Sequence, residues 1–236
     1  MRNKLKAYLL IEVGLYLTLL VLQVIHMSYG YSLKNNQGSL FIYIAIAHVG
    51  ITLSNLLYTI YIFVSNRNKD RIREDLFLVY FSFTLIADIF FSLTNYMFIG
   101  HIAFVICYLT FMVIRKAKIY EYIGCGLIGV SGIIILLLLH KLTLVLGIDC
   151  FLAPILALNM IMCIIKYVKK RNKENLILML ALIAIVISDV SVGLSSMFLN
   201  NIALTNIFSM IIWPFYMIGC SLLNVDYKVK RMEYIG

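Results

Sequence analysis

TLIADIFFSLTNY, residues 84–96, is a mostly apolar run that carries one carboxyl group, Asp88, near its middle. Together with the apolar residues before it, this run is long enough to cross a membrane as a helix. A charge inside hydrocarbon is costly, so we expect Asp88 to be paired, protonated or functional. AIVISDVSVGLSS, residues 184–196, repeats the arrangement around Asp189. The same costly feature therefore occurs twice in one chain.

The composition assigns the chain to the integral membrane proteins. Of the 236 residues, 63% are hydrophobic and only 13% are charged, which is outside the range of soluble globular domains. The N-terminal MRNKLK precedes an apolar stretch without a small-residue cleavage site. We therefore interpret this stretch as a retained first span rather than a signal peptide, and residues 1–236 as a single membrane domain.

Apolar stretches of membrane-spanning length alternate along the chain with charged or polar clusters. The chain contains only two prolines, so these stretches are expected to form largely unbroken helices. The predicted fold is all-α, a polytopic membrane protein with eight transmembrane helices. Their expected ranges are 7–29, 40–65, 76–95, 99–114, 122–139, 142–165, 176–198 and 203–225.

The distribution of cations predicts the orientation, since Lys and Arg accumulate in short cytoplasmic loops. Alternate connections, among them RKAKIYE (115–121), hold 18 of the 20 Lys and Arg residues when both terminal segments are included. Only Lys34 and Lys141 fall on the opposite side. Both termini are therefore predicted to be cytoplasmic, in a multi-pass protein of the cell (plasma) membrane. Anionic lipid headgroups account for the net charge of +9, and no nucleic-acid partner is expected.

The two aspartates indicate an internal repeat. They lie 101 residues apart, each on an odd-numbered predicted helix that precedes a short uncharged loop and another apolar span. A displacement of four spans predicts two parallel four-helix repeats, residues 1–119 and 120–236. Membrane proteins often build their sites where such halves meet.

Further polar residues reach the depth of the two aspartates. At a rise of 1.5 Å per residue, Asp88 and Asp189 are expected roughly 10–15 Å below the outer surface. Glu12 is expected to lie apart, near the inner face. Overlapping depths on the other helices permit one shared polar cavity with contributions from His48, Asn55, His101, Asp149 and Asn159.

No soluble type of catalytic device is recognisable. The sequence has no HExxH, no CxxC, no Gly-rich phosphate loop and no GxSxG. The five cysteines are therefore expected to be free, buried thiols, and neither a metal site nor a cofactor is predicted.

Four segments together resemble a known membrane family: ADIFFSL (87–93), GHIAFVICYLTF (100–111), ISDVSVGL (187–194) and WPFYMIG (213–219). The chain is similar in these segments to the YhhN-like lysoplasmalogenases, which have eight membrane helices. It departs from the family pattern at Ala87, where Gly is usual, at Tyr108, where His is usual, and at Gly219, where Gln is usual. The remaining helices match in hydropathy only.

The resemblance implies hydrolysis of the vinyl ether bond of a lysoplasmalogen, yielding a fatty aldehyde and glycerophosphoethanolamine or glycerophosphocholine. Asp88 and Asp189 are the implied catalytic residues. We assign proton donation to Asp88 and activation of water to Asp189, although the reverse assignment satisfies the same chemistry. The expected partners are a lysophospholipid, water and membrane lipids, and the oligomeric state is left open. Weaker substrate contacts are expected from Tyr216, Tyr108, His48, Asn55, Asp149 and Asn159.

Two other functions fit the same residues. Carboxylates near the middle of the membrane are also typical of small transporters and proton-coupled permeases. The departures at Tyr108 and Gly219 are compatible with a non-catalytic member that binds lipid. Aldehyde release from lysoplasmalogen separates the enzyme from both alternatives.

Overall fold

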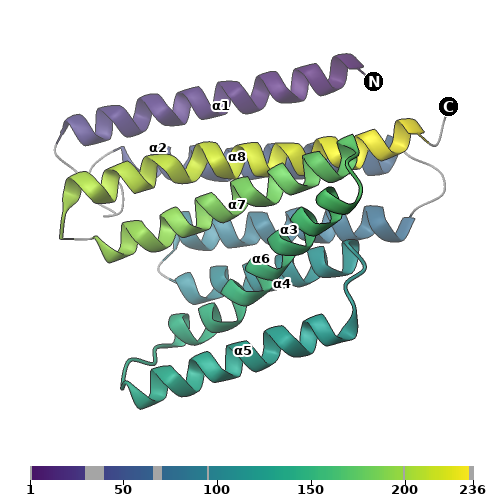
Figure 1. Cartoon of the computed structure of the whole chain (residues 1–236). Helices are drawn as coiled ribbons and strands as arrows, with labels where there is room; N and C mark the ends of the chain where they lie inside the picture. Colours follow the sequence, from purple (N-terminus) through teal and green to yellow (C-terminus); the bar gives the residue numbers. More distant parts are fainter. Residues whose placement is uncertain (1, 30–39, 66–70, 95, 199, 234–236) are drawn as a thin grey trace. The chain divides into compact units, whose positions relative to one another are not determined.

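The computed structural model describes residues 2–29, 40–65, 71–94, 96–198 and 200–233, and every regular element within them is an α-helix (Figure 1). By length and composition, eight of these helices are able to cross a membrane, which confirms the all-helical class. The orientation and the internal repeat stay predictions. The helices are α1 (Arg2–Ser28), α2 (Phe41–Ser65), α3 (Arg71–Leu93), α4 (Met97–Ile114), α5 (Ile119–Leu138), α6 (Leu144–Lys169), α7 (Lys173–Met197) and α8 (Ile202–Glu233).

Several helices extend beyond the predicted apolar stretches. α3 begins at Arg71 rather than at 76, and α5 begins at Ile119 rather than at 122. α6 continues to Lys169 and α8 to Glu233, past the predicted ends at 165 and 225. The extra turns are rich in Lys, Arg and Glu, which have high helix propensity. Such charged residues are typical of the ends of membrane-spanning helices. Hydropathy marks the hydrocarbon-spanning part of such a helix and misses its polar ends.

The chain divides into two compact units. Unit 1 comprises residues 1–55 and 163–236, with α1, α7, α8 and most of α2, and unit 2 comprises residues 56–162, with α3, α4, α5 and most of α6. The helices α2 and α6 contribute to both units. These boundaries differ from the predicted repeat halves, so the repeat gains no support from the division.

In unit 1, α7 packs along α8 and α1 also contacts α8. Gly219 of α8 permits a close approach, because a Cβ atom there would lie 3.0 Å from the carbonyl oxygen of Ala181 on α7 and 2.6 Å from Cγ1 of Ile185. Small residues at helix contacts are typical of membrane bundles, where lipid provides no hydrophobic drive for association. The closeness of α7 and α8 thus depends on a glycine.

In unit 2, α3 packs along α4, and α5 approaches α6 through two glycines. A Cβ atom at Gly129 would lie 2.4 Å from the Phe151 ring, and one at Gly132 would lie 2.9 Å from Cys150 Sγ. The buried residues of α5 are Glu121, Cys125 and Gly129, spaced one turn apart. α5 therefore contacts its unit along one narrow stripe.

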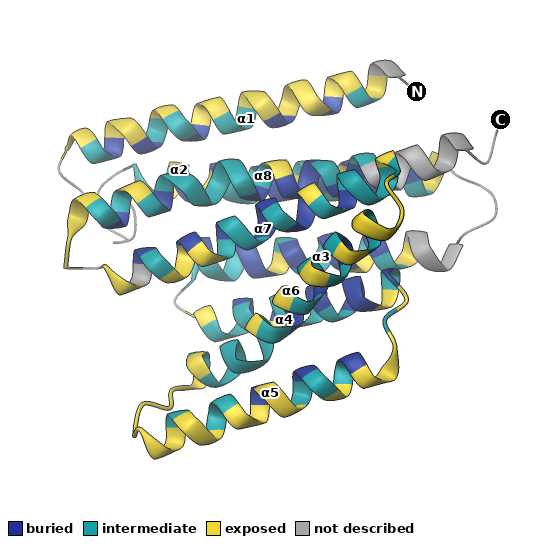
Figure 2. Ribbon diagram, in the orientation of Figure 1, coloured by how far each residue is buried: buried dark blue, intermediate teal, exposed yellow. Residues whose placement is uncertain are grey.

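Exposed positions recur along the helices (Figure 2), and many of them carry large apolar side chains. On α1, for example, Leu10 is 71% exposed and Val21 is 56% exposed, whereas Glu12 and Leu19 are buried. This is the reverse of the pattern in water, where helices turn polar residues outward. Such a surface is suited to hydrocarbon, and it supports a multi-pass membrane protein.

Gly219→Ala is expected to destabilise the protein by about 1–3 kcal/mol, because the added methyl group collides with the backbone of α7. Thermal unfolding in detergent measures the effect as a lower Tm. Gly193→Ala on α7 is the matched control, since a Cβ atom there meets nothing within 4 Å. Equal Tm values for the two variants would contradict the close approach.

Candidate functional site

Asp88 lies on α3 in unit 2 and is 4% exposed, inside a span of high hydropathy. Thr84 and Ser92, one turn away on either side, are also buried. Thr84 Oγ1 donates to the Tyr80 carbonyl oxygen (2.7 Å) and lies 3.4 Å from Cys107 Sγ of α4. Residues four apart share a face of a helix, so Asp88 belongs to a buried polar stripe on the side of α3 that meets α4.

Asp189 lies on α7 in unit 1 and is half-buried. Ser188 beside it is 1% exposed, whereas Val190 is 53% exposed. Ser191 is buried, and its hydroxyl donates to the Ile187 carbonyl oxygen at 2.8 Å. Asp189 therefore stands at the border between the buried and the outward faces of α7, in a less enclosed position than Asp88.

The two predicted catalytic residues belong to different units. Each carboxyl group lies inside a span, as predicted from the sequence. That Asp88 and Asp189 share one cavity stays a prediction, since each unit is described by itself. The six weaker candidates divide equally between the units: Tyr108, Asp149 and Asn159 lie in unit 2, and His48, Asn55 and Tyr216 lie in unit 1.

His48 and Tyr216 belong to an aromatic group that joins α2 to α8. The imidazole of His48 stacks on Trp213 with ring centroids 3.6 Å apart, and Trp213 meets Tyr216 edge-on at 5.5 Å. Trp213 also packs against the apolar core around Leu19 and Ile51. These contacts give His48 and Tyr216 a packing role, and a substrate contact by either residue stays a prediction.

Asn55 lies at the centre of a buried hydrogen-bond network between α1, α2 and α8. Its Nδ2 donates to Glu12 Oε1 at 3.1 Å, and its Oδ1 accepts from the Tyr8 hydroxyl at 2.7 Å. Asn224 Nδ2 of α8 donates to the same Oδ1 at 2.9 Å. Glu12 was expected to lie apart from the other polar residues, yet it is bonded to Asn55, one of the predicted contacts.

Asn159 belongs to a second buried cluster, in unit 2. Its Nδ2 donates to the Tyr108 carbonyl oxygen at 3.1 Å, and its Oδ1 accepts from Arg115 Nε at 2.6 Å. Arg115 Nη1 lies 2.6 Å from Glu121 Oε2. This cluster joins α4, α5 and α6 at the end where α4 meets α5.

Arg115 and Glu121 correct a sequence-based interpretation. Both were assigned to a cytoplasmic loop whose cations meet lipid headgroups, but each residue is only 6% exposed. α5 begins at Ile119, so Glu121 falls in its first turn, and Arg115 directly follows the end of α4. The ion pair with its hydrogen bond to Asn159 compensates the burial of the two charges.

His101 and Asp149 form a third polar contact. His101 Nδ1 lies 2.7 Å from Asp149 Oδ1, and the two side chains are 17% and 36% exposed. The Phe91 ring of α3 meets the imidazole edge-on at 4.9 Å and stacks on Phe104 at 5.5 Å. Asp149 is thus the partner of His101, and both side chains remain accessible.

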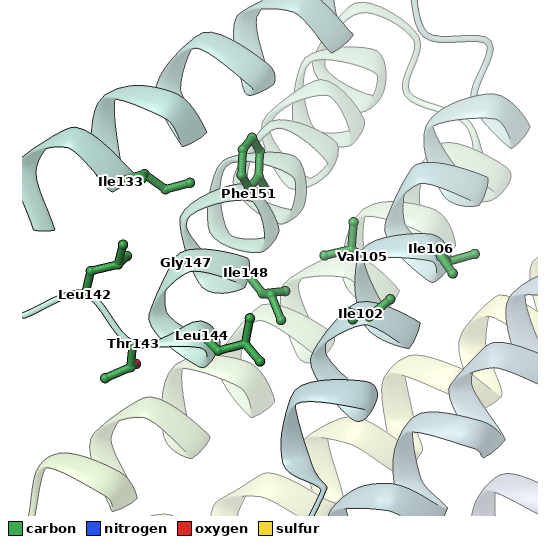
Figure 3. A pocket seen from close by; sticks show the side chains of 10 residues that line it. All are labelled: Ile102, Val105, Ile106, Ile133, Leu142, Thr143, Leu144, Gly147, Ile148 and Phe151. Carbon is green, nitrogen blue, oxygen red and sulfur yellow. The ribbon is translucent and has the colours of Figure 1, made fainter. Parts of the chain in front are cut away.

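An apolar groove of about 640 Å³ lies in unit 2, lined mainly by α4 and α6 (Figure 3). His101 precedes one lining residue of α4, and Asp149 follows one of α6, so the pair connects the two helices that wall the groove. Thr143 is the one lining residue with a polar side chain. The lining comprises Ile102, Val105 and Ile106 of α4, Ile133 of α5, Leu142 and Thr143 of the α5–α6 turn, and Leu144, Gly147, Ile148 and Phe151 of α6.

The part of the chain that the structure describes contains no group of three or more His, Cys, Asp or Glu able to hold a metal ion. None of the five cysteines forms a disulfide, and four of them are buried. The expectation of free cysteines is therefore confirmed, and burial is confirmed for all but Cys150.

Comparison with known proteins finds no matching family model, no matching curated protein and no matching solved structure. The resemblance to the YhhN-like lysoplasmalogenases therefore rests on the four segments of the sequence alone.

Glu121→Gln is expected to destabilise the protein by about 3–5 kcal/mol, because the charge of Arg115 would lose its buried carboxylate partner. Unfolding in detergent measures the loss. Glu174→Gln, in the first turn of α7, is the control and is expected to lower stability less, because Glu174 is only half-buried.

A double variant, Arg115→Met with Glu121→Leu, separates charge from packing. Replacing a whole buried ion pair by apolar side chains is often neutral, so the double variant is expected to recover part of the lost stability, while Asn159 Oδ1 still loses its donor. Wild-type stability of Glu121→Gln alone would contradict the structural role of the pair.

Proposed function

We propose that this chain is a membrane-embedded hydrolase that cleaves the vinyl ether bond of lysoplasmalogens. The observation that carries the proposal is Asp88, a carboxyl group that is 4% exposed inside an apolar span. Burying an ionisable side chain in a membrane costs free energy, so such a residue is first interpreted as part of a functional site. The proposal takes its substrate class from the resemblance of four segments to the YhhN-like lysoplasmalogenases.

Hydrolysis of a vinyl ether begins with protonation by an acid, and a base is needed only when water adds in the second step. A vinyl ether reacts when its outer vinylic carbon is protonated, since the electron pair of the C=C bond forms the new C–H bond and leaves an oxocarbenium ion. Water then adds to that cation and loses a proton, and the resulting hemiacetal collapses to a fatty aldehyde and a glycerophospho-alcohol. Two carboxyl groups supply both steps, one neutral as proton donor and one ionised as base and counter-charge.

The surroundings of the two aspartates differ. Asp88 is enclosed, at 4% exposed, whereas Asp189 is half-buried at the border of the outward face of α7. In our proposal the enclosed Asp88 donates the proton and the less enclosed Asp189 activates the water.

The depth of the aspartates also fits an ether lysolipid. Asp88 lies five residues before the end of α3 and Asp189 eight residues before the end of α7, or about 8 and 12 Å along the helices. The vinyl ether of a lysoplasmalogen is attached to the glycerol, just below the headgroup. A carboxyl group at this depth is within reach of the bond when the lipid stays in its leaflet.

Wild-type protein is expected to release fatty aldehyde from a lysoplasmalogen, measured by mass spectrometry. Asp88→Asn and Asp189→Asn are each expected to lower the rate at least about 100-fold, because an amide neither donates nor accepts the proton that the reaction moves. Asp75→Asn is the matched control, since Asp75 lies exposed near the start of the same helix as Asp88.

Folding of each variant is checked by its Tm in detergent. Unchanged aldehyde release in both folded Asn variants would exclude the proposed mechanism. A folded wild type that leaves lysoplasmalogen intact would exclude the proposed activity.

A second function, binding of a lysolipid without hydrolysis, is favoured by the groove beside His101 and Asp149. Its aliphatic walls and its volume of about 640 Å³ are typical of ligand sites, and the neighbouring polar pair offers contacts for a headgroup. In this case α4 and α6 hold the hydrocarbon chain. The groove belongs wholly to unit 2, so this function requires neither Asp189 nor unit 1.

Gly147→Phe tests the groove, because Gly147 lines it and a Cβ atom there meets only Leu142, at 3.7 Å. A ring at this position fills the groove, so the affinity for a fluorescent lysophospholipid is expected to fall about tenfold, or ~1.4 kcal/mol. Gly126→Phe on α5 is the control, as a Cβ atom there meets nothing within 4 Å. Equal affinities for the two variants would show that the groove holds no lysolipid chain.

A further inference from the structure

Glu12 is a buried carboxyl group that the proposed reaction does not use. It lies on α1 inside the candidate span Lys4–Ser28, about 12 Å along the helix from the start of that span. Its side chain belongs to unit 1 and the residue is 1% exposed. Glu12 therefore meets the same physical problem as Asp88 and requires its own explanation.

The two carboxyl oxygens of Glu12 have different surroundings. Oε1 accepts a hydrogen bond from Asn55 Nδ2 (3.1 Å) and is in direct contact with the Ser54 hydroxyl. Oε2 is enclosed and meets no hydrogen-bond donor in the described part of the chain. The contrast is Glu121, which is similarly buried but has Arg115 at 2.6 Å. An ionised Glu12 would leave its charge uncompensated.

Within the described residues, the hydrogen bonds of the network around Glu12 are directed away from Oε2. Asn55 Oδ1 already accepts from Tyr8 and Asn224, which holds the amide with Nδ2 toward Glu12. The other proton of that Nδ2 goes to the Ile51 carbonyl oxygen at 2.9 Å. The amide of Asn55 therefore accepts two hydrogen bonds at Oδ1 and donates two from Nδ2.

The Ser54 hydroxyl has one proton and two acceptors within reach. It is able to donate to the Ile51 carbonyl oxygen (3.1 Å) or to Glu12 Oε1. If it donates to Ile51, its oxygen is free to accept a proton from Glu12. The same geometry thus accommodates a neutral Glu12 that donates to Ser54, and an ionised Glu12 that accepts from Ser54.

We propose that Glu12 is an intramembrane proton-binding site, occupied at neutral pH, with the proton held between Oε1 and the Ser54 oxygen. Binding adds one proton and takes the carboxyl group from a charge of −1 to neutral. Oε2 then becomes the carbonyl oxygen of an uncharged acid, whose burial without a partner costs far less than that of a carboxylate. Release of the proton turns the Ser54 hydroxyl back toward Oε1.

Two further ionisable side chains adjoin the network, Tyr8 from α1 and Cys220 from α8. The groups from α2 are the amide of Asn55 and the hydroxyl of Ser54, and neither ionises. Tyr8 and Cys220 are also uncharged in their protonated forms, so neither supplies a cation. Because none of these side chains supplies a positive charge, the negative charge of Glu12 is removed by a proton bound to its carboxyl group.

Infrared spectroscopy of the full chain in lipid vesicles tests the proposal directly. Labelling with ¹³C-glutamate separates the carbonyl stretch of a protonated Glu from the bands of the aspartic acids. At neutral pH the wild type is expected to show a protonated-Glu band that Glu12→Gln removes. Glu174→Gln, at the half-buried start of α7, is expected to retain the band.

Ser54→Ala gives a second test that keeps Glu12 in place. Loss of the acceptor at Ser54 is expected to shift the band to higher frequency, and an unshifted band in a folded Ser54→Ala variant would overturn the placement of the proton. A wild-type spectrum without a Glu12-dependent acid band at neutral pH would overturn the proposal itself.

Stabilisation by NaCl relative to choline chloride, lost in Glu12→Gln, would also overturn the proposal, because it would identify a bound metal cation instead of a proton. All these readouts are independent of aldehyde release. They therefore succeed or fail separately from the proposed hydrolase activity.

Discussion

Hydrocarbon offers no hydrogen-bonding partner, and this constraint organises the whole chain. Backbone groups are satisfied within helices, so every described element long enough to cross the membrane is helical. Polar side chains inside those helices then bond to one another or to backbone carbonyl oxygens. Three groups follow from this constraint: the network around Asn55, the cluster around Arg115 and the contact between His101 and Asp149. Each lies within one unit and connects at least two of its helices.

The helices were predictable from hydropathy because apolar length is read directly from the sequence. The centres of all eight were right, and the errors concern their polar ends, as at Arg71 and Glu233. There, Lys, Arg and Glu continue the helix beyond its apolar stretch, and hydropathy carries no signal for this polar part. The close approaches at Gly219 and Gly129 were not predicted, because a glycine in an apolar run has the same hydropathy whether it faces lipid or a neighbouring helix.

The sequence identifies the buried polar residues, but it does not identify which of them contact one another. The cost of a charge in a membrane singles out Asp88, and the structure buries it. The same argument applies to Glu12, whose partners Ser54 and Asn55 were missed because they are distant in sequence. A signal was available in the spacing of Tyr8 and Glu12, which lie four residues apart on one face of α1. Partner choice depends on helix rotation, which hydropathy does not specify.

The pairing of Arg115 with Glu121 has a consequence for how the chain enters the membrane. In two-stage assembly, individual helices insert before they pack together. In the predicted orientation, Arg115 belongs with Lys116 and Lys118 to the positive charges that would keep this loop on the cytoplasmic side while the helices insert. In the packed structure the same arginine is bonded to Glu121 and Asn159. One residue would thus serve first as a topology signal and then as a contact that joins α4, α5 and α6.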